Sequence, residues 1–320
     1  MRTRSVVAIA VIAVLLAAGC GGLGKKRTGS CTGYPPDSPA YVGWGEDVSG
    51  LPVHPNSANF VNSIDASGGN GFLHADFGGG GAYGIPALTV PGSTAGVPVN
   101  FTAYGSESDP GAYKIPLNAP IEGGAGSTGD RHVLSLDYDN CILYELYRAF
   151  PQAGYWDADS GAIWNLRSSA LRPPEWTSAD AAGLPIFPGL VRFDEVAAGH
   201  IDHALRFTVG QTQDGYILPA THWAGSTSNP NVPPMGLRLR LAAWFDISGY
   251  AGQARVVLEA LKRYGMIVAD NGGSWFITGA ADPRFNDADL DQLKTVPGTA
   301  FEVVNTGAVC TGTQGPGVCS

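Results

Sequence analysis

The sequence predicts a mostly β fold, a β-sandwich or jelly roll, with one substantial helix near residues 248–264 and a loop-rich N-terminal arm. The first observation is that short segments alternate between apolar and polar residues with the period of two that strands require. The second is that only residues 248–264 carry a long helical pattern. The third is a content of 45 glycines and 23 prolines, which favours turns. No fixed-period repeat, P-loop, GxSxG, HExxH or dinucleotide-binding motif is present.

The first residues have the pattern of an export signal. Arg2 and Arg4 supply a charged start, and residues 6–18 form an apolar run that is too short to span a bilayer. The run ends in Leu-Ala-Ala-Gly-Cys at residues 16–20, which resembles the lipobox of bacterial lipoproteins, with Ala17 where that family favours leucine. The alternative is an ordinary secretory signal in which the cysteine has no role.

The lipobox resemblance implies cleavage after residue 19 and acylation of Cys20 with palmitate-type chains. The mature protein would then be held in the cell envelope, outside the cytoplasm, on the cell membrane or the outer membrane. Residues 20–33 are expected to form the tether, and the basic residues 25–27 within it suit a surface of anionic headgroups. The lipid is the only membrane contact expected, because no other segment is long and apolar enough to span a bilayer.

The charge of the chain excludes one large class of partner. The formal net charge is −9, and removal of residues 1–19 takes away two arginines, which leaves −11. An acidic, exported chain lacks the basic surface that nucleic acid requires, so no nucleic-acid partner is expected. No cofactor is predicted either, since no cofactor-binding motif is present.

Four cysteines remain once Cys20 is assigned to the lipid, and an even number outside the cytoplasm indicates two disulfides. Three pairings are open. We favour Cys310 with Cys319, which would close the glycine-rich tail, and Cys31 with Cys141, which would fasten the N-terminal segment to the domain. A thiol nucleophile at Cys141 is the alternative that oxidising surroundings disfavour.

Residues 34–125 are rich in Gly, Pro and Asn, and we expect them to form an arm that wraps a main domain at residues 126–320. Within the arm, residues 97–103 are a short predicted strand. His74 and Asp76 share a face if the chain is extended there, and they stand beside a run of glycines. We favour a plain loop over a ligand-binding loop at this point.

The main domain opens with a predicted hairpin. Residues 132–137 and 141–147 are strands, and the Asp-Tyr-Asp-Asn sequence between them is a turn. Calcium binding by Asp137 and Asp139 is the alternative interpretation, but the DxDxDG pattern is incomplete.

A strand is predicted at residues 200–207. His200, Asp202 and Arg206 fall on one face of it, and His203 falls on the other face with apolar neighbours. A strand separates the two histidines of the HxxH spacing, which excludes the geometry of a helical zinc site. We therefore predict no metal site and interpret His203 as a hydrogen-bonded core residue.

Residues 236–245 alternate clearly, with leucines on one face and Arg238, Arg240 and Trp244 on the other. If this strand lies in the same sheet as the preceding one, their polar faces combine, with Trp223 nearby, into a groove. An indole platform beside guanidinium groups suits a sugar ring and its hydroxyl or acidic groups. The alternative is a solvated face with incidental ion pairs.

The best helical segment is residues 248–264, with Ser248 as its cap, an apolar inward side and Gly265 after its end. An Asp-Asn-Gly-Gly sequence then predicts a hairpin between two short strands. The remaining elements are strands at residues 266–269, 274–278 and 301–304 and a short helix at residues 287–294.

Two blocks of the chain, residues 119–147 and 176–284, resemble a group of secreted bacterial proteins for which no activity is known. The phrases that carry the resemblance are APIEGG, GDRHVL, DNCILYELY, WTSADAAGLPI, PPMG and GMIVADNGGSW. They are long enough to indicate common membership. Because no chemistry is established for the group, the resemblance implies no catalytic residues.

Two hypotheses follow for function. The first is a surface enzyme that degrades extracellular polysaccharide, either as a glycoside hydrolase with two carboxylates or as a lyase with a histidine acid or base. The candidate catalytic residues are Asp194 and Glu195 on expected helical turns, together with Asp202, Asp137, Asp139, His200 and His222. The second is a non-catalytic protein that binds glycan, or has a structural role in the envelope, through the same aromatic and charged face. We favour the enzyme, because His and Asp residues cluster more than a binding module requires.

Overall fold

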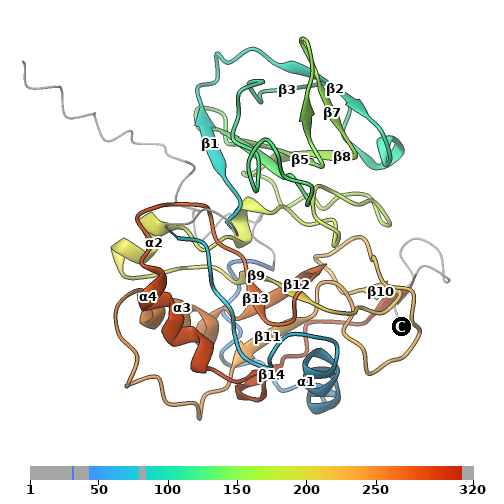
Figure 1. Cartoon of the computed structure of the whole chain (residues 1–320). Helices are drawn as coiled ribbons and strands as arrows, with labels where there is room; N and C mark the ends of the chain where they lie inside the picture. The colour runs from blue at the N-terminus through green and yellow to red at the C-terminus, as the bar shows by residue number, and fades with distance from the viewer. Residues whose placement is uncertain (1–30, 32–42, 79–83, 312–320) are drawn as a thin grey trace, which may run out of the picture.

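The computed structural model describes residues 31, 43–78 and 84–311, and it confirms a mostly β fold (Figure 1). The strands form four sheets. Two of them lie in an upper lobe, which we define as residues 84–170, and two in a lower lobe, residues 43–78 and 171–311 (Figure 1). An apolar cluster that includes Leu134 and Leu143 from the upper lobe and Ile186 and Leu190 from the lower lobe joins the two.

The upper lobe contains two four-stranded sheets. The first has the order β1 (Ala87–Val90), β4 (Val133–Asp137), β5 (Ile142–Tyr147) and β8 (Ser160–Asn165), and the second has the order β3 (Ala112–Tyr113), β2 (Val97–Phe101), β7 (Trp156–Ala158) and β6 (Phe150–Pro151). The predicted hairpin is confirmed, because β4 and β5 pair antiparallel with Asp137 opposite Ile142. Buried side chains such as Tyr113, Leu146 and Trp156 fill the space between the two sheets.

The lower lobe is built on a five-stranded mixed sheet. Its order is β13 (Phe276–Ile277), β9 (Leu205–Val209), β12 (Met266–Asn271), β11 (Arg238–Leu241) and β14 (Phe301–Val303). Strands β9 and β12 are parallel and the other pairs are antiparallel. The predicted hairpin after residue 266 is therefore wrong. The Asp-Asn-Gly-Gly segment joins two strands that lie on either side of β9, because each of them pairs with β9 and not with the other.

Helices pack around this sheet. They are α1 (Ser57–Ala66), α2 (Phe193–Ala198), α3 (Gly252–Arg263) and α4 (Asp287–Leu290), with short 3-10 turns at η3 (Phe187–Gly189), η4 (Asp291–Thr295) and η5 (Gly298–Ala300). A further 3-10 turn, η2 (Gly105–Glu107), belongs to the upper lobe. The remaining pair of strands is β10 (Gly215–Tyr216) with β15 (Cys310–Thr311). Among the described residues, no helix is long and apolar enough to cross a membrane.

The substantial helix is confirmed as α3, although it begins four residues later than its pattern predicts. Ser248 donates its backbone N–H and its hydroxyl to the carboxylate of Asp246 at 2.8 and 2.9 Å, which holds the chain in a turn before the helix. Gly265 follows the helix with φ of +70°, and a Cβ there would lie 2.1 Å from the Leu239 carbonyl oxygen. Only glycine fits at this close approach.

The N-terminal segment contributes to both lobes. Its residues 43–78 include α1, whose Phe60, Val61 and Ile64 are buried in the lower lobe. Its later residues supply β1, β2 and β3 to the upper sheets, so the predicted strand at residues 97–103 is confirmed over Val97–Phe101. Helix α1 was not predicted because it contains weak helix formers such as serine, asparagine and valine, and it is stabilised by tertiary burial instead.

The strand predicted at residues 200–207 exists only from Leu205 onward. Gly199 ends α2 in the left-handed region with φ of +86°, and residues 200–204 are irregular. The side chain of His203 is buried, as expected of a core histidine, and its Nδ1 donates to the Ala204 carbonyl at 2.7 Å. The alternation that placed His200 and Asp202 on one face with Arg206 is therefore absent.

The disulfide between Cys31 and Cys141 is present, with a Cα–Cα distance of 5.4 Å. It attaches the N-terminal segment to the turn before β5, which agrees with the predicted pairing. Cys310 lies in β15, but Cys319, its predicted partner, lies outside the described residues, as does Cys20.

Candidate active site in the cleft between the lobes

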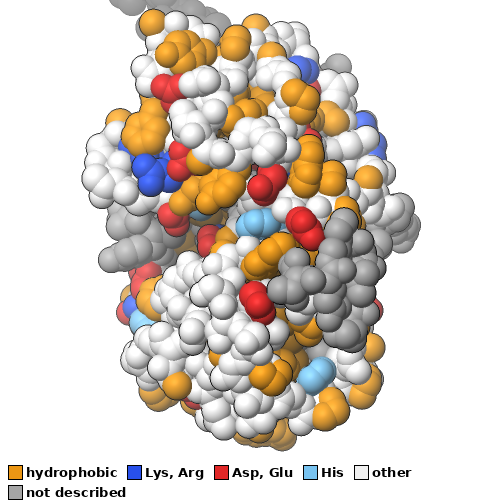
Figure 2. Space-filling model, turned by 90° about the vertical axis from the view of Figure 1, so that its right-hand side faces the viewer, with side chains coloured by type: hydrophobic (Ala, Val, Ile, Leu, Met, Phe, Trp, Pro, Cys, Tyr) orange, Lys and Arg blue, Asp and Glu red, His pale blue; other side chains and the backbone are white. Residues whose placement is uncertain are grey.

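A polar cleft lies where the two lobes meet. It consists of one cavity of about 280 Å³ and an adjoining cavity of about 170 Å³, which share Asp130, Asp270 and Asn271 in their linings. We call this combined space the interlobe cleft. Figure 2 shows acidic side chains and a histidine gathered at mid-height on one face, at the level where the lobes meet.

The floor of the cleft is a buried ionic cluster around Arg206 of β9. Its Nε and Nη2 donate to the two carboxylate oxygens of Asp180 at 3.0 and 2.9 Å. The same Nη2 donates to Oδ2 of Asp270 at 2.9 Å, and Nη1 donates to the hydroxyl of Thr278 at 2.9 Å. A bidentate pair of this kind fixes the orientation of all three charged groups.

A β-bulge explains why Asp270 joins this cluster. Val268 pairs with Phe207, but the next paired residue, Thr208, stands opposite Asp270, so Ala269 is an extra residue in β12. In a regular strand Asp270 would share the face of Val268. The bulge turns it to the face that carries Arg206 and Thr208. This happens near the carboxyl ends of the parallel pair β9 and β12, the edge at which sheets of this type bind ligands.

Burial and neighbouring charges set the protonation of the floor. Burial raises the pKa of the Asp270 carboxyl to about 6, which the attraction of Arg206 only partly opposes and the repulsion of Asp180 reinforces. Burial alone would lower the pKa of the Arg206 guanidinium, but Asp180 and Asp270 outweigh it and hold that pKa above its ordinary value. Arg206 is therefore a fixed cation, whereas Asp270 titrates close to neutrality.

The upper wall of the cleft carries Glu122, Asp130 and His132. The ligand-type atoms of the three side chains all lie within 4.8 Å of one another. His132 is buried, with Nδ1 2.6 Å from Oε2 of Glu122, and its Nε2 donates to the Ala179 carbonyl at 3.0 Å. Burial would lower the pKa of His132, but Glu122 raises it to about 9. Asp130 is exposed to the cleft.

Aromatic and imidazole groups line the mouth of the larger cavity. Tyr104, Tyr147 and His222 belong to its lining. His222 donates from Nδ1 to the Ala181 carbonyl at 2.7 Å, which directs its Nε2 to Glu107 at 3.9 Å. The cavity is thus bordered by rings and carboxylates, the two kinds of group that a sugar site combines.

Of the sequence-predicted site residues, the structure places Arg206 and His222 in the interlobe cleft. Trp223 lies next to it, with its ring stacked on His222 at 5.5 Å and on Tyr216 at 6.1 Å. These three residues come from the lower lobe. The sequence predicted them as site residues together with several others that lie outside the cleft. The cleft brings them together with residues of the upper lobe.

The predicted carboxylates of α2 lie elsewhere. Glu195 forms an ion pair with Arg192 and lies 3.2 Å from Nε2 of His203. Asp194 is 82% exposed and pairs with Arg284 at 2.7 Å. Neither belongs to the lining of the cleft, so the structure gives them no shared cavity with Arg206.

The other predicted acids and bases are also outside the cleft. His200 and Asp202 are exposed and pair with each other at 3.4 Å on the loop after α2. Asp137 is buried and accepts from Nζ of Lys114 at 2.7 Å, while Asp139 accepts from the backbone N–H of Gly92 at 2.8 Å. Both aspartates therefore have protein partners, Lys114 and Gly92, from segments outside the turn.

The predicted groove with Arg238, Arg240 and Trp244 is not formed. Arg238 shares a sheet face with Arg206, because both stand opposite Ile267. It is buried, however, and donates to the carbonyls of Tyr264 and Glu46 at 2.8 and 2.9 Å. The alternation of the strand is correct, but residues 43–51 cover this end of the face.

Arg240 and Trp244 differ in their surroundings. Arg240 donates to the Leu51 carbonyl at 2.8 Å and pairs with Glu302 at 2.7 Å, so it also fastens the covering segment. Trp244 lies beyond the end of β11 and is 71% exposed. An alternating pattern predicts which residues share a face, but it does not show what packs on that face.

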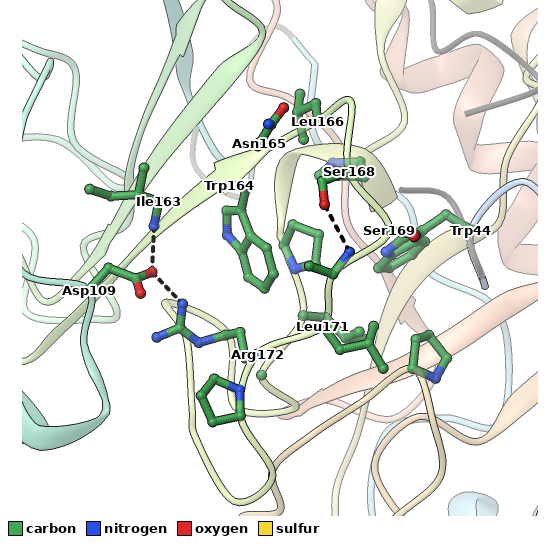
Figure 3. A pocket seen from close by; sticks show the side chains of 17 residues that line it. Trp44, Asp109, Ile163, Trp164, Asn165, Leu166, Ser168, Ser169, Leu171 and Arg172 are labelled. Carbon is green, nitrogen blue, oxygen red and sulfur yellow. Dashed lines mark hydrogen bonds and ion pairs between the residues drawn. The ribbon is translucent and has the colours of Figure 1, made fainter. Parts of the chain in front are cut away.

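A second, more apolar pocket of about 260 Å³ lies on another side of the junction (Figure 3). Its lining includes Trp44, Trp164 and Leu171, and Asp109 at its edge is neutralised by Arg172 at 2.6 Å. The indole N–H of Trp44 has no hydrogen-bond partner among the described residues. The pocket lacks a second carboxylate, so it is less suited to acid–base chemistry than the interlobe cleft.

Sequence reasoning missed Glu122, Asp130, His132, Asp180 and Asp270. Asp270 was interpreted as a turn former, which the bulge makes incorrect. A usable signal was present, because an aspartate that follows an apolar strand at its carboxyl end is a common position for a site residue. No local pattern indicates that residues 122–132 meet Asp270.

The chain was compared with protein-family models, with curated proteins and with solved structures, and none of the three comparisons found a match.

Proposed function

We propose that this protein is a surface-anchored, carbohydrate-active enzyme that hydrolyses glycosidic bonds of an extracellular polysaccharide in the interlobe cleft. The observation that carries the proposal is the placement of two carboxylates, Asp270 on the floor and Asp130 on the opposite lobe, along one cavity. Glycoside hydrolysis requires such a pair, in which one group protonates the leaving oxygen and the other acts on the opposite side of the bond.

Asp270 is suited to the role of proton donor. A general acid works best when its pKa is near the working pH, and burial gives Asp270 a pKa of about 6. Its Oδ2 accepts from Arg206 and its Oδ1 accepts from the backbone N–H of Asn271 at 2.8 Å, so the carboxyl group has a fixed orientation. Asp130 is exposed and is available to hold the attacking water.

The size and lining of the cleft support a sugar as substrate. A cavity of about 280 Å³ is at the lower limit for small-ligand sites and accommodates a short segment of a chain better than a folded partner. Tyr104 and Tyr147 offer ring surfaces for stacking, and Asn271 offers an amide for hydroxyl groups. The predominance of carboxylates over cations favours a neutral glycan over an acidic one.

The anchoring part of the proposal is supported by the lipobox resemblance at residues 16–20, which lie outside the described structure. Substitution of Cys20 by alanine is expected to prevent labelling with radioactive palmitate. It should also move the protein from the detergent phase to the aqueous phase in a Triton X-114 partition. Labelling that persists in this variant would contradict the lipid anchor.

The activity is tested with the mature lipoprotein in detergent and a panel of neutral and acidic polysaccharides. We expect new reducing ends without the absorbance of unsaturated products, and loss of turnover in Asp270→Asn and Asp130→Asn. Glu195→Gln and His200→Ala are matched controls outside the cleft and should retain turnover. Unsaturated products would indicate a lyase instead, and glycan binding without turnover would indicate a non-catalytic binding protein.

A further inference from the structure

We infer that Glu122, Asp130 and His132 form a binding site for a divalent transition-metal ion on the upper wall of the interlobe cleft. One imidazole nitrogen and two carboxylate groups converge there within 4.8 Å of one another. This inference goes beyond the proposed hydrolase, because the ion would bind whether or not a sugar is cleaved.

The backbone holds two of the three ligands in place before any ion binds. The N–H of Glu122 donates to the His132 carbonyl at 3.0 Å, and the N–H of His132 donates to Oε2 of Glu122 at 3.2 Å. His132 directly precedes β4, which begins at Val133, and Asp130 lies two residues before His132. Ligands that are fixed by backbone pairs at the start of a strand bind an ion with little loss of conformational entropy.

The second ring nitrogen of His132 fixes how the imidazole faces the site. Because a carbonyl oxygen can only accept, Nε2 must donate to Ala179, which lies 3.0 Å away. Nδ1 is then the atom directed to Glu122, at 2.6 Å from Oε2. A ring N–H bonded to a carbonyl is the usual support of a metal-binding histidine, and the ion would take the place of the hydrogen between Nδ1 and the carboxylate.

The donor set favours zinc or manganese over calcium or magnesium. Calcium and magnesium prefer oxygen ligands throughout, whereas an imidazole nitrogen suits zinc and related metals. Three protein ligands leave at least one coordination position open, and the exposure of Asp130 directs it to the cleft. Arg206 is the nearby cation, but Asp180 and Asp270 already neutralise it.

The position of the site is significant only if the hydrolase proposed above is correct. In that case a water molecule bound to the ion would lie in the cleft that also contains Asp270. Coordinated water loses its proton more readily than free water, so the ion held by Asp130 would activate the attacking water in place of the free Asp130 carboxylate.

Isothermal titration calorimetry on the full mature chain in detergent, after removal of metal by a chelator, tests the inference without any substrate. We expect one equivalent of Zn²⁺ to bind, and we expect Asp130→Asn and Glu122→Gln each to weaken binding at least about tenfold. Titration with Co²⁺ should give visible absorption bands that are lost in Asp130→Asn. Asp202→Asn, which removes an exposed carboxylate beside His200, is the matched control and should bind as the unmodified protein does.

Two outcomes would overturn the inference. One is that the unmodified chain binds neither Zn²⁺ nor Mn²⁺. The other is that Asp130→Asn and Glu122→Gln both bind the ion as tightly as the unmodified chain does. The failure of the hydrolase would look different. Metal binding without turnover on any glycan would contradict the proposed function but not the metal site. Turnover by a chain that binds no metal would support the proposed function and contradict the metal site.

Discussion

Arg206 and Arg238 lie on the same face of the same sheet, on either side of Ile267, but they have different surroundings and different roles. Arg206 is surrounded by the carboxylates of Asp180 and Asp270 at the edge of an open cavity. Arg238 is surrounded by backbone carbonyls of residues 43–46 and of Tyr264. The first arginine organises a site, and the second fastens a chain segment.

The two environments have opposite effects on charge. Carboxylates hold the pKa of Arg206 above its ordinary value, whereas burial lowers the pKa of Arg238 to about 10 because the more distant Glu46 and Asp47 compensate less. The hydrogen bonds of a buried arginine therefore do not by themselves identify a functional site. The informative feature is a neighbouring carboxylate whose own titration is shifted toward neutrality, as Asp270 shows.

The largest effect is expected at the carboxylate that distinguishes the two regions. Asp270→Asn should lower kcat by about 10²–10⁴-fold, the range that a general acid contributes, because the amide cannot donate a proton to a leaving oxygen. In the unmodified enzyme, kcat should decline as pH rises above about 6, where Asp270 loses its proton. The measurement is a pH profile of reducing-end formation. A profile that stays flat from pH 5 to 8 would count against this role.

Removal of each arginine should affect stability by a different mechanism. Arg206→Met leaves the buried carboxylate of Asp180 and the partly buried carboxylate of Asp270 without a cation and should cost about 3–5 kcal/mol of unfolding free energy near neutral pH. The cost should shrink at pH 5, where Asp270, whose pKa is raised to about 6, can accept a proton. Arg238→Met leaves neutral carbonyls and the half-exposed Glu46 carboxylate, which lies 3.9 Å from Arg238 and which water can solvate, so it should cost about 1–3 kcal/mol at either pH.

Urea unfolding of both variants at pH 5 and pH 8 makes this comparison. The unmodified chain at the same two values is the reference. Equal pH dependence in the two variants would show that the carboxylate cluster does not distinguish Arg206 from Arg238.

Much of this contrast lay outside the reach of sequence reasoning. Three features were predictable, because each depends on residues close together in the chain: the alternation around Arg238, the hairpin of β4 and β5, and helix α3. The segment that covers Arg238 comes about 190 residues earlier in the chain. The bulge that turns Asp270 toward Arg206 depends on the pairing of two strands separated by a helix. Local patterns carry no information on either event.

Glu145 of β5 is the acidic counterpart of Arg238, a buried charged residue whose hydrogen-bond partners are neutral. Substitution of Glu145 should affect stability less than Arg206→Met does and more than Asp194→Asn does. It is fully buried and accepts from the backbone N–H groups of Ile186 and Phe187 and from the Trp164 indole, with no cation among these partners. Burial raises its pKa to about 7, from an ordinary value of 4.5. Below pH 4.5 it is protonated in the folded and the unfolded chain alike.

Between these two values the unfolded chain ionises while the folded chain does not, so the contribution of Glu145 to stability falls as pH rises to about 7. The loss should approach about 3 kcal/mol and then stop. Glu145→Gln cannot ionise and lacks this decline, so the free energies of unfolding of the two chains should converge between pH 4.5 and 8. A difference that does not vary with pH in urea titrations would refute the raised pKa.

The smallest effect is expected at Asp194, which contrasts with Asp270 most sharply. Both are aspartates paired with an arginine, but Asp194 is 82% exposed and its partner Arg284 is also bound to Asp282. Exposed pairs of this kind contribute little, since water screens both charges and Arg284 keeps its second carboxylate. Asp194→Asn should therefore leave the midpoint of urea unfolding and the turnover on glycan unchanged. Loss of turnover in this variant, with Asp270→Asn still active, would place the reaction at α2, which carries two of the catalytic candidates predicted from the sequence, and would exclude the interlobe cleft as the active site.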